Sequence, residues 1–109
     1  MKKKFRILKS DEFTQIIQHR HYYHGGSLVL YVKKRTNSTS SRVGISVTKK
    51  LGNAVKRNKA KRQIRDICNK LYNFNEKFDT IIIVRASYDI KKYEDNLKLL
   101  ISLYNKVKI

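Results

Sequence analysis

Residues 49–65 combine dense positive charge with the periodicity of a packed helix, and no other segment constrains the fold as strongly. They read KKLGNAVKRNKAKRQIR, with eight Lys or Arg and no acidic residue in seventeen positions. Small or apolar residues then recur at the spacings i, i+4, i+7, i+8 and i+11, which lie on one side of an α-helix. These residues are Ala60, Ile64, Ile67, Cys68 and Leu71. Such a helix packs on a core through its apolar side, so its opposite side has a fixed orientation.

The opposite side of this predicted helix carries basic and amide side chains. At about 100° per residue, a second stripe lies roughly half a turn away from the apolar one. It consists of Asn58, Lys61, Arg62, Arg65 and Asn69. The preceding loop and the first turn add Lys49, Lys50, Lys56 and Arg57, and the free N–H groups and dipole of a helix start also attract anions. A positive surface held in place by folding predicts a nucleic-acid interface rather than a merely solvated face.

The net charge of the whole chain indicates a polyanionic partner. With 26 Lys or Arg against 8 Asp or Glu in 109 residues, the formal charge is +18, far above the magnitude of about 2 to 8 that keeps a small domain soluble. Such self-repulsion opposes a compact state unless a polyanion binds. A membrane is not expected as the partner, because the apolar side of the basic helix has no Trp or Phe and no apolar run approaches the roughly twenty residues of a span.

The length predicts a single domain over residues 1–109. The start, MKKKFRILKS, is not followed by an apolar secretory region, so a cytoplasmic location is expected. A single cysteine, Cys68, excludes an internal disulfide, and its place on the apolar side of the helix predicts an inert core thiol.

The remaining segments predict an α+β sandwich with helices against one sheet. A first helix is expected from a Ser10 cap to about His19, with Phe13, Ile16 and Ile17 on one face. Two strands at 28–32 and 42–48 are expected to pair as a hairpin across a loop at 36–41. After the basic helix we expect a connection at 73–77, a strand at 80–85 and a last helix from about residue 90. The strand at 80–85 is expected to be buried on both sides and to run parallel to the strand at 42–48.

The strand at 42–48 alternates apolar residues with small or polar ones. Gly44 and Ser46 lie on its small face, where they leave room for something large to approach the backbone. Phe13 and Tyr31 are the aromatic residues that could stack on unpaired nucleotides, although the apolar face of the first helix serves a core equally well.

No set of residues predicts catalysis by side chains. The eight carboxylates are scattered and none is spaced to pair with a histidine, so no catalytic residue is expected. His19, His21 and His24 lie close in sequence, but no helical i, i+4 pair or nearby carboxylate completes a metal site. GNAVKRNK lacks the ending of a phosphate loop. We therefore expect no metal bound by side chains and no small-molecule substrate.

The segment RVGISVTKKLGNAVKRNKAKRQIRDI, at residues 42–67, closely resembles the signature of the protein subunit of bacterial ribonuclease P. A DEF-type first helix, a VLYV strand, an IIIVRA strand and a Leu-rich last helix follow the same order, so the resemblance spans almost the whole chain. In fold, it implies a mostly antiparallel four-stranded sheet, about three helices and a βαβ unit with a left-handed crossover, against the usual right-handed rule.

In function, the resemblance implies an RNA-binding subunit that assists a catalytic RNA in removing the 5′ leader of precursor transfer RNA. The Mg²⁺ used in the reaction is held by that RNA. The family's contacts with the catalytic RNA would fall on Lys49, Lys50, Lys56, Arg57, Asn58, Lys59, Lys61, Arg62 and Arg65. The leader would lie in a cleft lined by Phe13, Ile17, Tyr31 and Ser46.

The chain departs from the family's pattern at two of these positions. Lys59 replaces the second arginine of the Arg-Asn-Arg step, which keeps the charge but loses the planar fork. Ile17 stands where the family often has an aromatic residue, so apolar contact would replace stacking. The best alternative function is a basic structural protein of the ribosome, and a third is an autonomous protein nuclease, which the lack of an acid/base cluster disfavours.

Overall fold

The computed structural model describes residues 5–35, 41–72 and 78–107. Along the chain these form α1 (Ser10–Gln18), β1 (Tyr22–Gly25), β2 (Leu28–Lys34), β3 (Arg42–Val47), the 3-10 turn η2 (Lys49–Leu51), α2 (Ala54–Leu71), β4 (Phe78–Val84) and α3 (Tyr93–Asn105). The predicted connection at 73–77 and all but Ser41 of the predicted loop at 36–41 lie outside the described residues.

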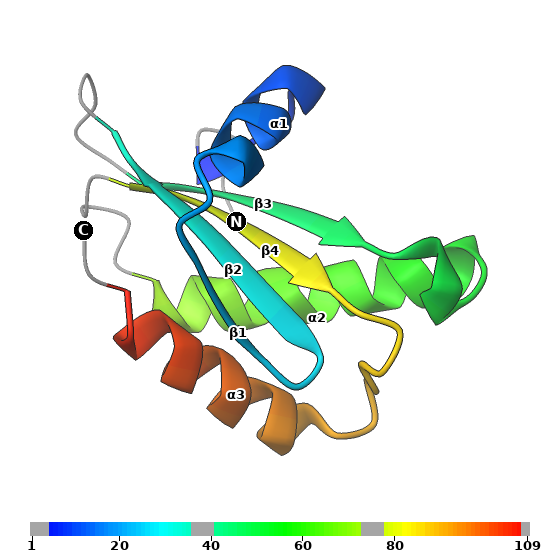
Figure 1. Cartoon of the computed structure of the whole chain (residues 1–109). Helices are drawn as coiled ribbons and strands as arrows, with labels where there is room; N and C mark the ends of the chain where they lie inside the picture. The colour runs from blue at the N-terminus through cyan, green and yellow to red at the C-terminus, as the bar shows by residue number, and fades with distance from the viewer. Residues whose placement is uncertain (1–4, 36–40, 73–77, 108–109) are drawn as a thin grey trace.

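The four strands form one mixed sheet in the order β1-β2-β4-β3. β1 pairs with β2 and β2 with β4 in antiparallel register, whereas β3 and β4 run parallel. Helices α2 and α3 cover one face of the sheet and α1 lies on the other (Figure 1). The predicted α+β class and the parallel pair are therefore confirmed.

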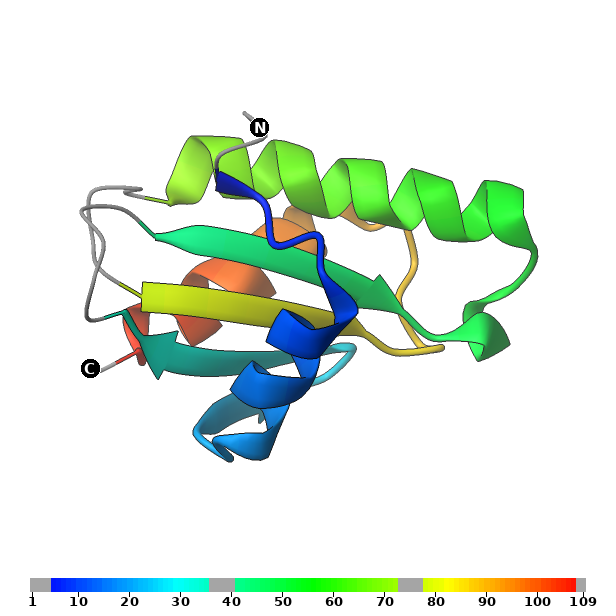
Figure 2. The ribbon, with the colours of Figure 1, turned by 90° about the horizontal axis from the view of Figure 1, so that it is seen from above.

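The crossover from β3 through α2 to β4 is left-handed. In Figure 2 the viewer looks from the α1 side; β3 and β4 run in the same direction, and α2 returns on the far side of the sheet. The left-handed crossover is the one that the family resemblance implies. Nearly all other βαβ units have a right-handed crossover.

The predicted hairpin between the strands at 28–32 and 42–48 is wrong. β4 lies between β2 and β3: Leu30 pairs with Ile82, and Ile82 pairs with Ile45 on the other side. The physical reason is burial. β4 is apolar on both faces and buried along nearly its whole length, so it takes the protected centre of the sheet and separates two strands that are neighbours only in sequence.

The sequence does not predict the strand β1, because the histidines and glycines of HRHYYHGG are typical of a polar connection. It forms a tight hairpin with β2 in which Gly25 pairs with Leu28. Gly26 occupies the turn with φ of 51°, a left-handed conformation that favours glycine. Several boundaries also differ from the prediction: β2 extends to Lys34, β4 begins at Phe78 and α3 begins at Tyr93. Ser10 is not a cap, since Lys9 holds the N-cap position without a side-chain hydrogen bond.

The main core lies between the sheet and the helices α2 and α3. The predicted apolar side of α2 faces it: Ala60, Ile64, Ile67 and Cys68 are fully buried, and Leu71 is partly buried against the core. Burial raises the pKa of the Cys68 thiol, which fits the predicted inert core residue.

A partly buried polar network joins α2 to α3 and to the segment before α3. The side-chain carbonyl of Gln63 accepts hydrogen bonds from the Tyr88 hydroxyl and the Asn96 amide, and its own amide donates to the backbone carbonyl of Ile90. Because each of these groups has a partner, the network fixes how α2 sits relative to α3. The direction of the exposed side of α2 is thereby set.

Candidate RNA interface

The start of α2 and the turn before it are held by side-chain caps and by Leu51, which packs against the main core. The Thr48 hydroxyl accepts from the backbone N–H of Lys50 at 3.4 Å, and the Asn53 side chain accepts from that of Lys56 at 3.0 Å. Gly52 between them has φ of 150°. These caps leave the lysine side chains of this region, Lys49, Lys50 and Lys56, exposed to solvent.

The predicted RNA-binding residues of α2 lie around the part of the helix that the core leaves uncovered, and they differ in depth. Asn58, Lys59 and Arg62 are exposed, whereas Arg57, Lys61 and Arg65 are half-buried. The acidic residue of this helix, Asp66, forms an ion pair with Lys70, with 3.3 Å between Oδ2 and Nζ. The helix therefore presents a positive surface about 12 Å long from Arg57 to Arg65, at about 1.5 Å per residue.

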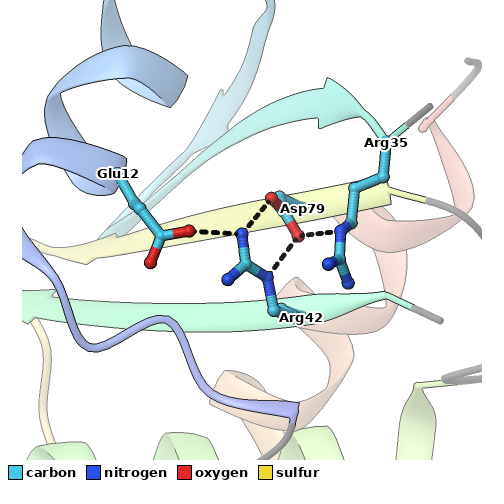
Figure 3. Close-up of polar contacts among 4 residues, drawn as sticks. All are labelled: Glu12, Arg35, Arg42 and Asp79. Atoms are coloured by element: carbon cyan, nitrogen blue, oxygen red, sulfur yellow. Dashed lines mark hydrogen bonds and ion pairs between the residues drawn. The ribbon is translucent and has the colours of Figure 1, made fainter. Parts of the chain in front are cut away.

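Helix α1 is tied to the opposite face of the sheet by an ion-pair cluster (Figure 3). Arg42 on β3 donates from Nε and Nη2 to the two carboxylate oxygens of Asp79 on β4, at 3.1 and 2.8 Å. The same Nη2 lies 2.8 Å from a carboxylate oxygen of Glu12 on α1, and Arg35 lies 3.5 Å from Asp79. The hydrogen bond to Asp79 is the main reason that the pKa of Arg42 is raised. Arg42 thus links a carboxylate of β4 to a carboxylate of α1 and positions α1 on the sheet.

Three of the four predicted leader-binding residues come together beneath α1. Phe13, Ile17 and Tyr31 are partly buried around a small second core of Ile7, Ile16 and Ile81, with Ile83 beside them. Ser46 is exposed and does not belong to this cluster. It lies on the same face of the sheet, because side chains alternate along β3 and Gly44, two residues earlier, faces Phe13.

The sheet face beside α1 also carries an aromatic residue that the sequence analysis did not single out. Tyr22 on the edge strand β1 is 50% exposed, and its ring centroid is 5.3 Å from that of Tyr31. Its other ring neighbour is His24, with centroids 6.1 Å apart. The missed strand explains the omission, since only the pairing of Tyr22 with Tyr31 in β1 and β2 brings the two rings together.

The three histidines do not converge. His21 shares a hydrogen bond of 3.1 Å with the Tyr23 hydroxyl, and His24 lies beside Tyr22, while exposed His19 follows the end of α1. Within residues 5–35, 41–72 and 78–107, no group of three His, Cys, Asp or Glu side chains is arranged to hold a metal ion. No helix in these ranges is both long and apolar enough to cross a bilayer.

A hollow of about 220 Å³ connects the basic helix with the leader-binding residues. Lys61 and Arg65 of α2 line one side of it, and Phe13 lines another. The N-terminal segment, which crosses β3 between α2 and α1 in Figure 2, contributes Arg6 and Leu8. Arg6 is not among the predicted site residues, because nothing local in the sequence indicates that this segment passes beside α2.

Comparison with known proteins gives one consistent result. A family model described as Ribonuclease P matches residues 1–108. A ribonuclease P protein component of Listeria monocytogenes is 42% identical over 101 residues, and the match covers 89% of this chain and 85% of the relative. A ribonuclease P protein component of Clostridium novyi is 39% identical over 113 residues, and the match covers 96% of this chain and 100% of the relative. The solved structure of the Staphylococcus aureus RNase P protein superposes with a TM-score of 0.81 at 32% identity, covering 93% of each chain.

Proposed function

Because the chain belongs to the ribonuclease P protein family and is thus a subunit of the ribonuclease P holoenzyme, we propose that it serves the reaction by binding two RNAs on two surfaces. The exposed side of α2 and the turn before it bind the catalytic RNA. The sheet face beside α1 binds the single-stranded 5′ leader of precursor transfer RNA. The protein contributes positioning and charge neutralisation, and the catalytic RNA holds the Mg²⁺ used in hydrolysis.

The observation that carries this proposal is the fixed positive side of α2. Its opposite side is buried in the core and its orientation is set by the network around Gln63, so the backbone positions from which its lysines and arginines project are fixed. Each phosphate that such a surface neutralises releases counterions and contributes to affinity. Fixed positions present these charges to a folded RNA without the loss of conformational entropy that a disordered basic tail undergoes on binding.

The leader surface is supported by its chemistry. Tyr31, Tyr22 and the outer part of Phe13 supply flat apolar groups, which are the usual platforms for unpaired bases, each worth about 1 to 3 kcal/mol. Ser46 is exposed on the same face and can donate or accept a hydrogen bond. Single-stranded RNA fits this surface better than a duplex, whose bases are already stacked on one another.

The proposal is tested by reconstitution. Purified protein is mixed with the ribonuclease P RNA of the same organism, and processing of precursor transfer RNA is followed at low Mg²⁺ concentration. We expect the protein to restore processing under conditions in which the RNA alone is slow, and we expect no cleavage by protein freed of RNA. Cleavage by RNA-free protein that disappears when one of its own carboxylates is replaced would instead identify an autonomous nuclease.

A competition experiment separates the proposal from a ribosomal role. Labelled ribonuclease P RNA is displaced from the protein by unlabelled ribonuclease P RNA or by ribosomal RNA fragments of equal length. Both are polyanions, so a difference between them reports shape rather than charge. Equal displacement by the two RNAs would contradict specific recognition of the catalytic RNA.

A further inference from the structure

The edge strand β1 carries rings that continue the leader surface beyond Tyr31. Tyr22 and His24 are two residues apart on this strand, so their side chains lie on the same face of the sheet. Tyr22 pairs with Tyr31 on β2, and the centroids of these two rings are 5.3 Å apart. The centroid of the His24 ring lies 6.1 Å from that of Tyr22. The three rings therefore form a continuous row that passes from β2 onto the edge of the sheet.

The two rings on β1 are open to solvent. Tyr22 is 50% exposed and His24 is also exposed, whereas Tyr31 is half-buried. Among the Phe and Tyr residues that the structure describes, Tyr22 is the one that is exposed. Its ring contributes little to either core, so its surface is available to a ligand from outside the protein.

The residue that leads into β1 has a strained backbone. Arg20 has φ of 60°, and it is the one non-glycine residue with a positive φ among those that the structure describes. Its N–H donates to the carbonyl of Ile17 at 3.1 Å where the chain leaves α1. A left-handed conformation is unfavourable for a residue with a β-carbon, and such strain is found most often at functional sites. The exposed Arg20 side chain begins within about 7 Å of the Cα of Tyr22, since the two residues are two peptide units apart.

The strand β1 is also the edge of the sheet that lies farther from the basic helix. The strand order is β1-β2-β4-β3, so β1 and β3 are the outer strands, roughly 14 Å apart at about 4.8 Å per strand. Helix α2 runs beside β3 in Figure 2, and its residues Lys61 and Arg65 share a hollow with Val43 of β3. Because the catalytic RNA is assigned to α2, the bond that it cleaves lies nearer to β3 than to β1.

We propose that Tyr22 and His24, together with the guanidinium group of Arg20, form an additional leader subsite on β1. Its ligand is an unpaired nucleotide that lies farther from the cleaved bond than the nucleotides at Phe13 and Tyr31. The base stacks on the ring of Tyr22, and Arg20 neutralises the adjacent phosphate. The subsite rests on the proposed function, which supplies the leader. A second copy of this chain is not the occupant, because two chains with a charge of +18 repel each other.

The first experiment measures the affinity of the holoenzyme for precursor transfer RNAs whose leaders are lengthened one nucleotide at a time. Tyr22→Ala should bind precursors with the shortest leaders as the wild type does. It should lose about fivefold or more once the leader is long enough to reach β1, since fivefold is the lower end of what one stacked base contributes. Tyr22→Phe keeps the ring and should keep wild-type affinity at every length, whereas Tyr22→Leu keeps an apolar side chain without a ring face and should lose most of it.

Arg20→Gly separates binding from stability. Glycine adopts a φ of 60° without strain, so this variant should unfold at the same temperature as the wild type or at a higher one. Its affinity for precursors with long leaders should nevertheless fall, and the salt slope should decrease by about one unit because one phosphate contact is lost. Arg20→Lys keeps the charge and should keep the slope. The control Lys98→Gln removes a charge from an exposed position on α3 and should leave the slope unchanged.

Photocrosslinking tests the position of the subsite without any variant. Precursors carry a single 4-thiouridine at successive leader positions, and mass spectrometry identifies the protein residues that become joined to it in the wild-type holoenzyme. We expect crosslinks to residues 20–24 from leader positions farther from the cleaved bond than those that crosslink to Phe13. The reverse order would overturn the assignment of β1 to the distal part of the leader.

The length series also distinguishes failure of this subsite from failure of the proposed function. The subsite is overturned if Tyr22→Ala loses nothing at any leader length, or loses equally at all lengths, while Phe13→Ala still weakens precursor binding. An unchanged salt slope in Arg20→Gly would overturn the role of Arg20. The proposed function fails instead if the affinity of the wild-type holoenzyme does not depend on the leader and no leader position crosslinks to the protein.

Discussion

The ring of Phe13 on α1 lies against the backbone of Gly44 on β3. A β-carbon at Gly44 would stand 2.7 Å from Cζ of Phe13 and 2.8 Å from Cδ1 of Ile81. The room that the sequence predicted above Gly44 is therefore occupied by the protein's own ring. Part of Phe13 belongs to the second core, and only its outer part is available to a nucleotide.

Gly44→Ala should displace the Phe13 ring and loosen α1. The atoms that the added methyl group meets belong to two side chains packed in the second core, Phe13 and Ile81, and both must shift. We therefore expect a loss of about 1 to 3 kcal/mol in the free energy of unfolding, as for overpacked cores. Ser46→Ala on the same face is the control, because Ser46 is exposed and already has a β-carbon. Urea unfolding of both variants measures the difference, and equal stability of the two would contradict the close contact.

Phe13→Ala should cost the holoenzyme about 1 to 3 kcal/mol of affinity for precursor transfer RNA and little for mature transfer RNA, since stacking on the leader is lost. The measurement is the ratio of the two affinities at saturating protein. Ile17→Phe should strengthen precursor binding modestly if this position also faces the leader. Equal losses for precursor and product on Phe13→Ala would assign Phe13 to the core alone.

Replacing both Arg62 and Arg65 with Ala should weaken binding of the catalytic RNA and reduce the salt slope by about one to two units, because one or two phosphate contacts are lost. The fold should persist, since both side chains point away from the apolar side of α2. A matched control removes two exposed charges from the end of the molecule at α3, Lys98 and Lys106. An unchanged slope in the α2 variant, or an equal change in the control, would locate the interface elsewhere.

Arg42→Gln should destabilise the fold more than Glu12→Gln. Without Arg42, the Asp79 carboxylate, whose side chain is 10% exposed, keeps a single longer contact among the described residues, the one with Arg35. We expect a loss of about 2 to 3 kcal/mol, typical of hydrogen bonds to a charged group. Glu12→Gln removes a more exposed pair and should cost about 1 kcal/mol or less. Thermal unfolding orders the two variants, and the reverse order would show that Glu12 holds the cluster.

Tyr88 should make stability depend on pH in the alkaline range. Burial raises the pKa of its hydroxyl above the ordinary value of about 10. The unfolded chain therefore loses this proton at a lower pH than the folded chain, and the stabilisation is complete below about pH 10 and decreases above it. The difference in unfolding free energy between the wild type and Tyr88→Phe should be constant up to about pH 9 and fall beyond that. A difference that stays constant to higher pH would contradict the raised pKa.

Short-range patterns in the sequence predicted the elements whose two sides differ in chemistry. The spacing of Ile64 and Ile67 identified the buried side of α2, and it also determined where Arg62 had to face. Four consecutive aliphatic residues from Ile81 identified a strand buried on both sides. These predictions were correct because a helix or strand converts spacing along the chain directly into sidedness, with no information needed from other segments.

Strand order and the composition of the sites depended on contacts between distant segments. The sequence alone could not place β4 between β2 and β3, because consecutive strands with a loop between them usually pair directly, and burial of β4 overrode that preference. Nor could it reveal that Tyr22 lies beside Tyr31, or that Arg6 lines a hollow with Arg65, since both depend on pairing and packing of residues far apart in the chain. The sequence itself determined the residue types and the sidedness of α2. The tertiary structure decided which of the described charges have counter-ions, because the pairing of charges depends on which segments the folded chain brings together.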